Sequence, residues 1–150
     1  MGAILDDLKS RFPNYPNLKA VEDFVIGVVK DLDPLLIIMF GALPRGDYTY
    51  NSDVDTLLIT DEPTTWNEIY AYGGGVVQPI SKTKDDFIQQ LKRGNPFFIQ
   101  IMEEGIILHS RVGVLDEFKT IASETISKMR MIRVERGWEI DDEDEEEEEV

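Results

Sequence analysis

The spacing of apolar residues in the first third of the chain predicts a helix followed by a strand. Apolar side chains recur every three or four positions over residues 18–32, the period of an amphipathic helix. Asp33-Pro34 ends this helix, because the residue before a proline is pushed out of the helical region of backbone space. Residues 35–40 form an apolar run that is too short for a core helix, so they are predicted as a buried strand.

The rest of the chain alternates short strands with helices. Residues 41–53, rich in Gly, Pro, Asp, Asn and Ser, are predicted as a loop with room for one short helical turn. Further strands are predicted over residues 54–60, 76–80 and 106–109, and further helices over residues 65–72, 83–91 and 97–103. A last helix begins near Leu115 and ends at an unspecified point before Gly137. We therefore expect an α/β (α+β) fold, in which a small mixed β-sheet has helices packed on one face.

Charge divides the chain into two parts. Of 30 Asp and Glu residues against 15 Lys and Arg, nine form the unbroken run 141–149, so residues 1–140 carry a net charge of only -6. We expect one domain over residues 1–140 and a disordered acidic tail over 141–150, because like charges repel and bury no apolar surface. The sequence lacks the clustered Lys and Arg that hold phosphate groups, so we expect neither direct binding of duplex DNA nor a basic membrane-binding face.

Three arginines near the end of the last predicted helix recur at every third position. Arg130, Arg133 and Arg136 would share one face of that helix. A solvated surface explains such a row more often than a phosphate-bearing partner does, since isolated surface ion pairs are weak.

Composition removes several classes of function. The absence of cysteine excludes a disulfide framework, a thiolate metal site and a cysteine nucleophile, and a single histidine excludes a multi-histidine zinc site. The first nine residues lack the basic start and long apolar stretch of a secretion signal. The apolar run 35–40 is far shorter than the ~20 residues that span a bilayer. We expect a cytoplasmic protein.

The predicted loop and the strand after it hold the candidate chemistry. Asp53 and Asp55 alternate along the chain, so on a strand both carboxylates lie on one face. Their repulsion favours a shared cation, for which Mg²⁺ is the natural candidate. Upstream, Gly41 lets the backbone approach a ligand, Gly46 frees the turn around Arg45, and loop N–H groups can hold a triphosphate. A lone Asp-x-Asp usually marks a solvated turn, but this combination is suited to phosphoryl or nucleotidyl transfer.

This stretch resembles the minimal nucleotidyltransferases of the DNA polymerase β superfamily. Their signature is Gly-Ser, ten residues and then Asp-x-Asp, with Arg-Gly shortly after Gly-Ser and Ser before the first Asp. The chain has Gly41-Ala42, ten residues and Asp53-Val54-Asp55, with Arg45-Gly46 and Ser52 in the corresponding places. The resemblance covers residues 18–110, including the segments 78–87, 95–98 and 104–108.

The resemblance implies the family's palm-like fold and a set of roles. Asp53 and Asp55 would be the catalytic and metal-binding carboxylates, with Mg²⁺ as the cofactor. The nucleotide-binding residues would be Gly41, Ala42, Arg45, Gly46 and Ser52. The implied activity transfers a nucleoside monophosphate from a nucleoside triphosphate (NTP), foremost ATP, to a hydroxyl acceptor. Several small members are antitoxins that modify a helical partner of the HEPN class (higher eukaryote and prokaryote nucleotide-binding), so the acceptor can be a protein side chain.

Two departures from the family pattern leave a second hypothesis open. Ala42 replaces the family's serine, and counting back from Phe87 places Gln78 at the position of the family's third carboxylate. Glutamine is a very poor base, and losing general-base assistance typically costs ~10²–10⁴ in rate. The alternative is therefore a catalytically degenerate module that binds nucleotide or a helical partner without turnover. A fold that only displays the acidic tail is a third and more distant hypothesis.

Overall fold

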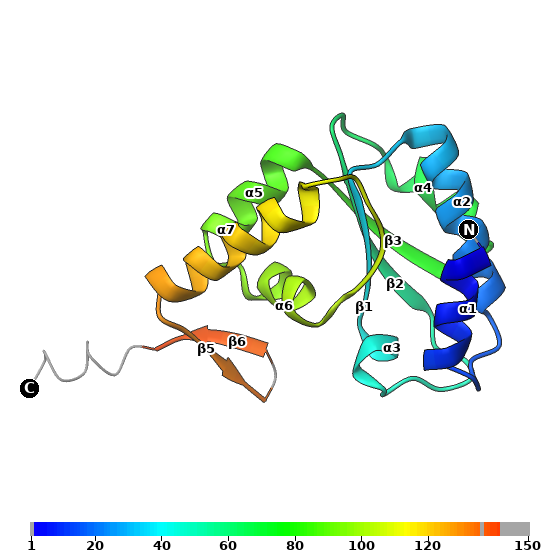
Figure 1. Ribbon diagram of the computed structural model, residues 1–150, viewed down its shortest axis with the longest axis horizontal. Helices are drawn as coiled ribbons and strands as arrows, with labels where there is room; N and C mark the ends of the chain where they lie inside the picture. Colours follow the sequence, from blue (N-terminus) through cyan, green and yellow to red (C-terminus); the bar gives the residue numbers. More distant parts are fainter. Residues whose placement is uncertain (1, 136, 142–150) are drawn as a thin grey trace, which may run out of the picture.

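The computed structural model describes residues 2–135 and 137–141, and its centre is a four-stranded mixed sheet (Figure 1). The strands are β1 (Leu36–Phe40), β2 (Val54–Thr60), β3 (Val77–Thr83) and β4 (Ile106–Ser110), in the order β3-β2-β1-β4. β1 is antiparallel to both β2 and β4, whereas β2 and β3 are parallel. This confirms the predicted α/β fold class.

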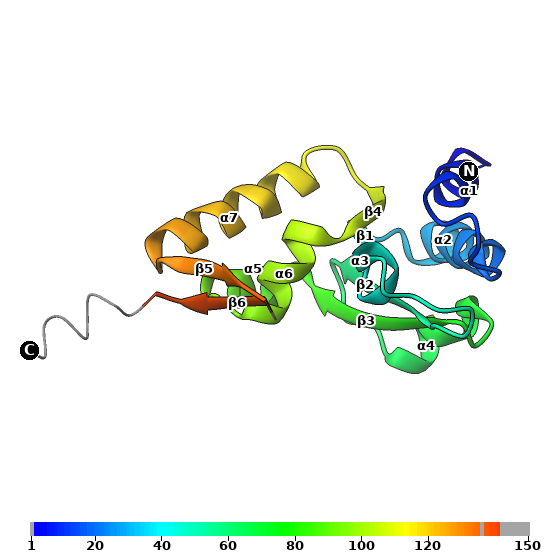
Figure 2. The ribbon, with the colours of Figure 1, turned by 90° about the horizontal axis from the view of Figure 1, so that it is seen from below.

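Helices cover both faces of the sheet, so the prediction of helices on one face was wrong (Figures 1 and 2). One face carries α1 (Gly2–Arg11), α2 (Leu18–Leu32) and α4 (Trp66–Tyr70), which a short 3₁₀ turn follows. The other carries α5 (Lys84–Lys92), α6 (Pro96–Glu104) and α7 (Val114–Lys128). The reason lies in β1 and β2, which are buried at nearly every position and therefore bury both faces.

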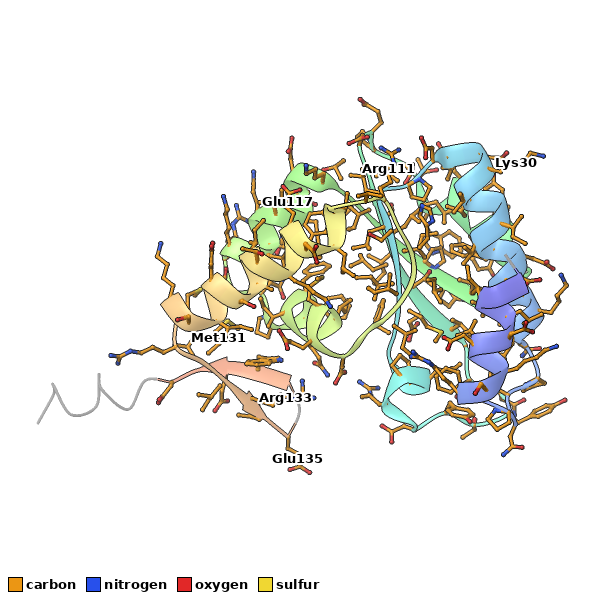
Figure 3. All side chains as sticks on the ribbon, in the orientation of Figure 1. Lys30, Arg111, Glu117, Met131, Arg133 and Glu135 are labelled. Atoms are coloured by element: carbon orange, nitrogen blue, oxygen red, sulfur yellow. The ribbon has the colours of Figure 1, made fainter. Side chains whose placement is uncertain are left out.

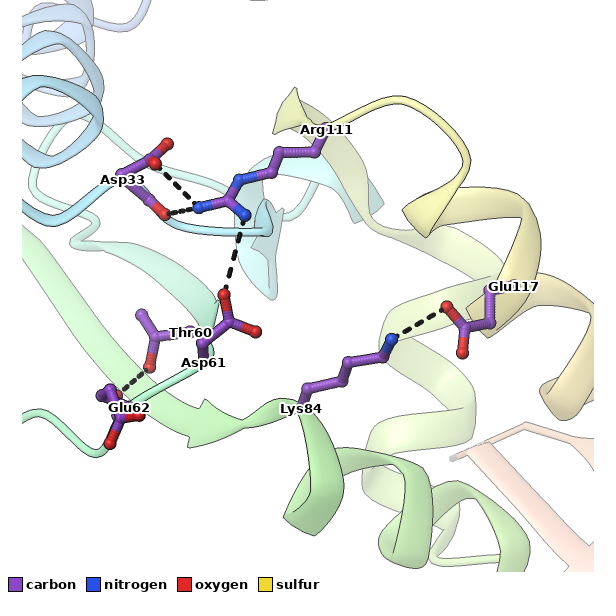
Figure 4. A network of polar contacts seen from close by, with 7 residues as sticks. All are labelled: Asp33, Thr60, Asp61, Glu62, Lys84, Arg111 and Glu117. Atoms are coloured by element: carbon purple, nitrogen blue, oxygen red, sulfur yellow. Dashed lines mark hydrogen bonds and ion pairs between the residues drawn. The ribbon is translucent and has the colours of Figure 1, made fainter.

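A polar network fastens the turn between α2 and β1 (Figure 4). Asp33 ends α2 in the left-handed conformation, with φ 46°. The Arg111 guanidinium, at the far end of β4, donates to the Asp33 carbonyl and lies 2.9 Å from its Oδ2. It also lies 3.6 Å from Oδ2 of Asp61, directly after β2. Arg111 thus joins the ends of three neighbouring strands on the side of the sheet away from the β1–β2 loop.

Two regions of structure were not predicted from the sequence. One is the N-terminal helix α1, and the other is the hairpin of β5 (Met131–Val134) and β6 (Gly137–Ile140), which packs against α6. The predicted row of arginines on one helical face is wrong, because α7 ends at Lys128 and Arg133 lies on β5, where Figure 3 labels it. Arg130 has φ 54° and precedes the hairpin, and Arg136 lies outside the described residues.

Two expectations concern the C-terminus and membranes. Of the predicted disordered tail 141–150, only Asp141 belongs to the part of the chain that the structure describes, and residues 142–150 lie outside it. Within the described part, no helix has the length and apolar character required to cross a bilayer.

Candidate functional site

The loop from β1 to β2 turns sharply at Gly41. This residue has φ 86° and ψ -138°, a backbone conformation that is open essentially to glycine alone. The chain then makes the single helical turn α3 (Ala42–Arg45), which ends at Gly46 with φ 79°. Because the first N–H groups of a helix have no carbonyl partner within it, α3 itself does not use those of Ala42 and Leu43.

Asp55 lies directly against this turn. It is the second residue of β2, paired with Phe40 at the end of β1, so the antiparallel register brings it beside Gly41. A Cβ atom at position 41 would stand 2.6 Å from Oδ2 of Asp55, which is closer than carbon and oxygen can approach without displacement. The glycine is therefore required both by the backbone conformation and by the space that the carboxylate occupies.

The bend before Asp53 is held by hydrogen bonds around Ser52. The Ser52 hydroxyl accepts a hydrogen bond of 2.8 Å from the Thr49 N–H, and the Ser52 N–H donates to the Thr49 carbonyl at 3.1 Å. The hydroxyl of Tyr15, a buried residue before α2, donates to the Ser52 carbonyl. Tyr15 was not singled out from the sequence, and no local motif marks it, because it reaches the loop only through the fold.

The two predicted carboxylates interact electrostatically. Burial of the side chain raises the pKa of Asp55, the neighbouring Asp53 carboxylate raises it further, and Arg45 lowers it. Asp53 itself is exposed, and Arg45 is half-exposed with its Nε 3.5 Å from Oδ2 of Asp47. A cation held by Asp53 and Asp55 would offset this repulsion.

This donor set fits Mg²⁺ with a bound triphosphate. No group of three or more Asp, Glu, His or Cys side chains able to hold a metal occurs among residues 2–135 and 137–141. Mg²⁺ is usually held by one or two carboxylates, with substrate phosphates and water completing its octahedral shell. Asp53 and Asp55 supply hard oxygen ligands of this kind, and the loop N–H groups beside them would hold the phosphates.

Gln78 lies beside Asp55 in the sheet. The two residues are partners in the parallel pairing of β2 with β3, and paired residues of neighbouring strands project from the same face. No Asp or Glu occurs on β3, so Gln78 presents a neutral amide next to the carboxylate. The position counted from the sequence is thus the one that adjoins Asp55, and the catalytic consequence stays a prediction.

A pocket of about 190 Å³ opens beside Asp55, between the β1–β2 loop and α6. Of the predicted site residues, Gly41, Arg45 and Asp55 line it, whereas Ala42, Gly46, Ser52, Asp53 and Gln78 are not part of its lining. The rest of the lining consists of Phe40 and the α6 residues Phe97, Gln100, Ile101 and Glu104. Their i, i+3, i+4, i+7 spacing is the sequence signal that would have marked this face of α6.

Comparison with known proteins decides the family. The model of the nucleotidyltransferase domain family matches residues 24–109, more than half of the chain, and this range includes the Gly41 loop, both aspartates and α6. The chain belongs to this nucleotidyltransferase family. Among curated proteins, a "putative protein adenylyltransferase" of Methanocaldococcus jannaschii is 28% identical to this nucleotidyltransferase domain over 98 residues, which cover 61% of this chain and 96% of the relative.

Two solved structures are also similar to this nucleotidyltransferase domain. A "putative nucleotidyltransferase" from Sulfolobus solfataricus aligns with a TM-score of 0.47 and 18% identity, covering 73% of this chain and 90% of that one. A toxin–antitoxin structure with AMP-PNP aligns with a TM-score of 0.47 and 18% identity, covering 73% and 86%. The family assignment rests on the sequence match over residues 24–109.

Proposed function

We propose that this protein is a Mg²⁺-dependent nucleotidyltransferase that transfers a nucleoside monophosphate from an NTP to a hydroxyl acceptor. The observation that carries the proposal is the contact of the Asp55 carboxylate with Gly41, at the rim of a pocket. It supports the proposal because the carboxylate proposed to hold the metal lies against the loop proposed to hold the phosphates. ATP is the first donor to test, because the Methanocaldococcus relative is named as an adenylyltransferase.

In the proposed reaction, the acceptor hydroxyl oxygen forms a bond to the α-phosphorus of the NTP. The bond from that phosphorus to the bridging oxygen of the β-phosphate breaks, pyrophosphate leaves, and the hydroxyl proton passes to water. The N–H groups at the start of α3 and the Arg45 guanidinium would hold the triphosphate, and Asp53 and Asp55 would hold Mg²⁺. When bound, Mg²⁺ neutralises charge on the transferring group.

The proposed acceptor is a side chain of a partner protein. The name of the Methanocaldococcus relative, a protein adenylyltransferase, supports a protein acceptor. A helical HEPN-type partner, in an antitoxin-like pairing, is the candidate that the family resemblance suggests. A cytoplasmic location is part of the proposal, since the donor and Mg²⁺ are available there.

The direct test is label transfer from α-³²P-ATP in Mg²⁺ to the partner protein. We expect transfer by the wild type, none in EDTA, and none by Asp53→Asn or Asp55→Asn. Asp85→Asn is the control, because Asp85 is exposed at the start of α5 and does not line the pocket. Equal transfer by wild type and Asp55→Asn would refute the proposal.

One observation favours a second function, nucleotide binding without turnover. Gln78 lies beside Asp55 in the sheet, at the position where the family resemblance implies a third carboxylate. In a degenerate binding module, Gln78→Asp would create an activity that the wild type lacks. In an active enzyme, it would change an existing rate. Gln78→Asn is the matched control, because it shortens the side chain equally but adds no charge.

A further inference from the structure

The pocket has an apolar wall built around Phe97. The Phe97 side chain is 44% exposed although it is a large hydrophobic residue. Edge contacts hold its ring, with centroid distances of 5.5 Å to Phe40 and 5.1 Å to Phe98. An exposed aromatic ring that neighbouring rings hold in position is suited to stacking a nucleobase, and such stacking adds to the binding free energy.

The polar part of this wall consists of Gln100 and Glu104. Gln100 Nε2 donates to Glu104 Oε1 at 2.8 Å, which fixes the orientation of the amide. Glu104 is a carboxylate with 22% of its side chain exposed and accepts only. In the described lining the one cation, Arg45, belongs to the phosphate-binding loop, and no Lys or Arg comes from α6.

The C-terminal hairpin holds Glu104 in place. Arg133 on β5 donates from Nη2 to Glu104 Oε2 at 2.9 Å, and its guanidinium carbon lies 5.9 Å from the centre of the Trp138 ring on β6. Two donors, one on each oxygen, fix the orientation of the Glu104 carboxylate. Position 133 lies outside residues 24–109, the part that matches the family. Arg133 is therefore a positioning residue outside the matched domain.

We propose that this end of the pocket holds the nucleobase of the donor, stacked on Phe97, and that Glu104 accepts a hydrogen bond from an exocyclic amino group. The inference rests on the proposed function and deepens it, because it names the class of NTP. A carboxylate cannot donate to a keto oxygen and repels it, so amino-bearing bases bind better than their oxo analogues. A site built to pair with an N–H group rejects an analogue that lacks it.

The test compares matched nucleotides by isothermal titration calorimetry in Mg²⁺. The pairs are GTP with inosine triphosphate, which isolates the 2-amino group of guanine, and ATP with inosine triphosphate and CTP with UTP, which exchange an amino group for a keto oxygen and the adjoining ring nitrogen for an N–H group. We expect at least one pair to differ by about 10-fold or more, the usual worth of a hydrogen bond to a charged group. Tripolyphosphate, which has no base, reports on the phosphate-binding loop alone.

Variants assign the discrimination to residues. Glu104→Gln should bring the preferred pair to within about 2-fold, because an amide can also donate to a keto oxygen. Glu103→Gln, an exposed neighbour outside this pocket, should leave the ratio unchanged. Arg133→Ala should lower the ratio and Arg133→Lys should partly restore it. Phe97→Ala should weaken every nucleotide about equally, by about 10-fold, without affecting tripolyphosphate.

The outcomes separate this inference from the function on which it rests. If all three pairs bind within 2-fold, or Glu104→Gln leaves the ratio unchanged, base recognition by Glu104 is wrong while nucleotide binding by the Gly41 loop stands. If tripolyphosphate binds and NTPs bind no better, the base has no site on Phe97. If neither NTPs nor tripolyphosphate bind in Mg²⁺, both the inference and the proposed function are refuted.

Discussion

The carboxylate of Asp55 occupies the space into which a side chain at Gly41 would project. Its Oδ2 lies 2.6 Å from the position that a Cβ atom would take there. The end of β1 and the start of β2 are thus in tight contact at these two residues, so a substitution of Gly41 would displace Asp55.

Gly41→Ala is expected to destabilise the protein and to abolish nucleotide binding. The new methyl group combines backbone strain at φ 86° with overlap on Asp55, together roughly 2–5 kcal/mol. Gly46→Ala is the matched control, because it has φ 79° and nothing within 4 Å of the added Cβ, so it costs only the strain, about 1–2 kcal/mol. Urea unfolding of both variants measures the difference, and equal losses would contradict the role of the contact.

Asp55→Asn is expected to stabilise the metal-free protein at pH 7 while removing its response to Mg²⁺ and ATP. Burial and then Asp53 raise the pKa of Asp55 above its ordinary value of 3.8, so ionisation at neutral pH works against the folded state. The folded chain binds the proton more tightly than the unfolded chain, so stability falls as pH rises through the window above 3.8. Thermal melts should show the gain at pH 7 and its disappearance below pH 3.8. If Asp55→Asn is less stable than wild type at pH 7, ionisation of Asp55 does not destabilise the folded protein and the prediction is wrong.

Tyr15→Phe is expected to lower both stability and transfer activity. It removes the hydrogen bond to the Ser52 carbonyl, which costs about 0.5–1.5 kcal/mol and loosens the bend before Asp53. Tyr50→Phe is the control, since the Tyr50 side chain is 72% exposed. The measurements are the transfer rate and the urea midpoint of each variant. The prediction is wrong if Tyr15→Phe, like Tyr50→Phe, matches wild type in both.

The same variant makes a prediction at alkaline pH. Burial raises the pKa of Tyr15 above its ordinary value of 10.0, an effect that the hydrogen bond to Asn17 partly offsets and Asp53 reinforces. Above pH 10 the unfolded chain loses this proton while the folded chain keeps it, so the free energy of unfolding falls as pH rises. Tyr15→Phe should show a shallower fall than wild type in melts between pH 9 and pH 11. Parallel curves would refute the prediction.

Arg111→Ala is expected to lower stability by about 0.5–1.5 kcal/mol without changing nucleotide affinity. Arg111 holds Asp33 and Asp61 at the end of the sheet remote from Gly41 (Figure 4). A double-mutant cycle with Asp33→Asn should give a larger coupling than one with Asp61→Asn, because the first pair is at 2.9 Å and the second at 3.6 Å. The reverse order would contradict the geometry.

The sequence predicted best the elements whose ends carry local signals. The helix over residues 18–32 and the strand over residues 54–60 have their predicted bounds, and Thr83 caps α5 by accepting from the Asp86 N–H at 3.2 Å. The Gly41 loop was predicted for the same reason, since its glycines, Arg45 and the two aspartates lie within fifteen residues. Such signals depend only on residues close together in the sequence, so they can be recognised before the fold is known.

What the sequence missed depends on contacts between distant segments. The β5–β6 hairpin follows the periodic pattern of α7 without a break, and Arg133 meets Glu104 only because the chain reverses after Lys128. The residues of α6 likewise line a pocket only because the fold places them opposite the β1–β2 loop. The site roles of Asp53, Ala42, Gly46 and Ser52 remain predictions that the experiments above test.

The in-register pairing of β2 with β3 also determines how few substitutions would give this chain a site with three carboxylates. Seven ladder pairs hold position 78 beside Asp55, so an acidic side chain there would require no movement of the backbone. Codons for glutamine and glutamate differ in a single base. A random library of this gene therefore contains Gln78→Glu among its simplest variants, and genetic selection for transfer activity would test whether a carboxylate at this position raises the rate.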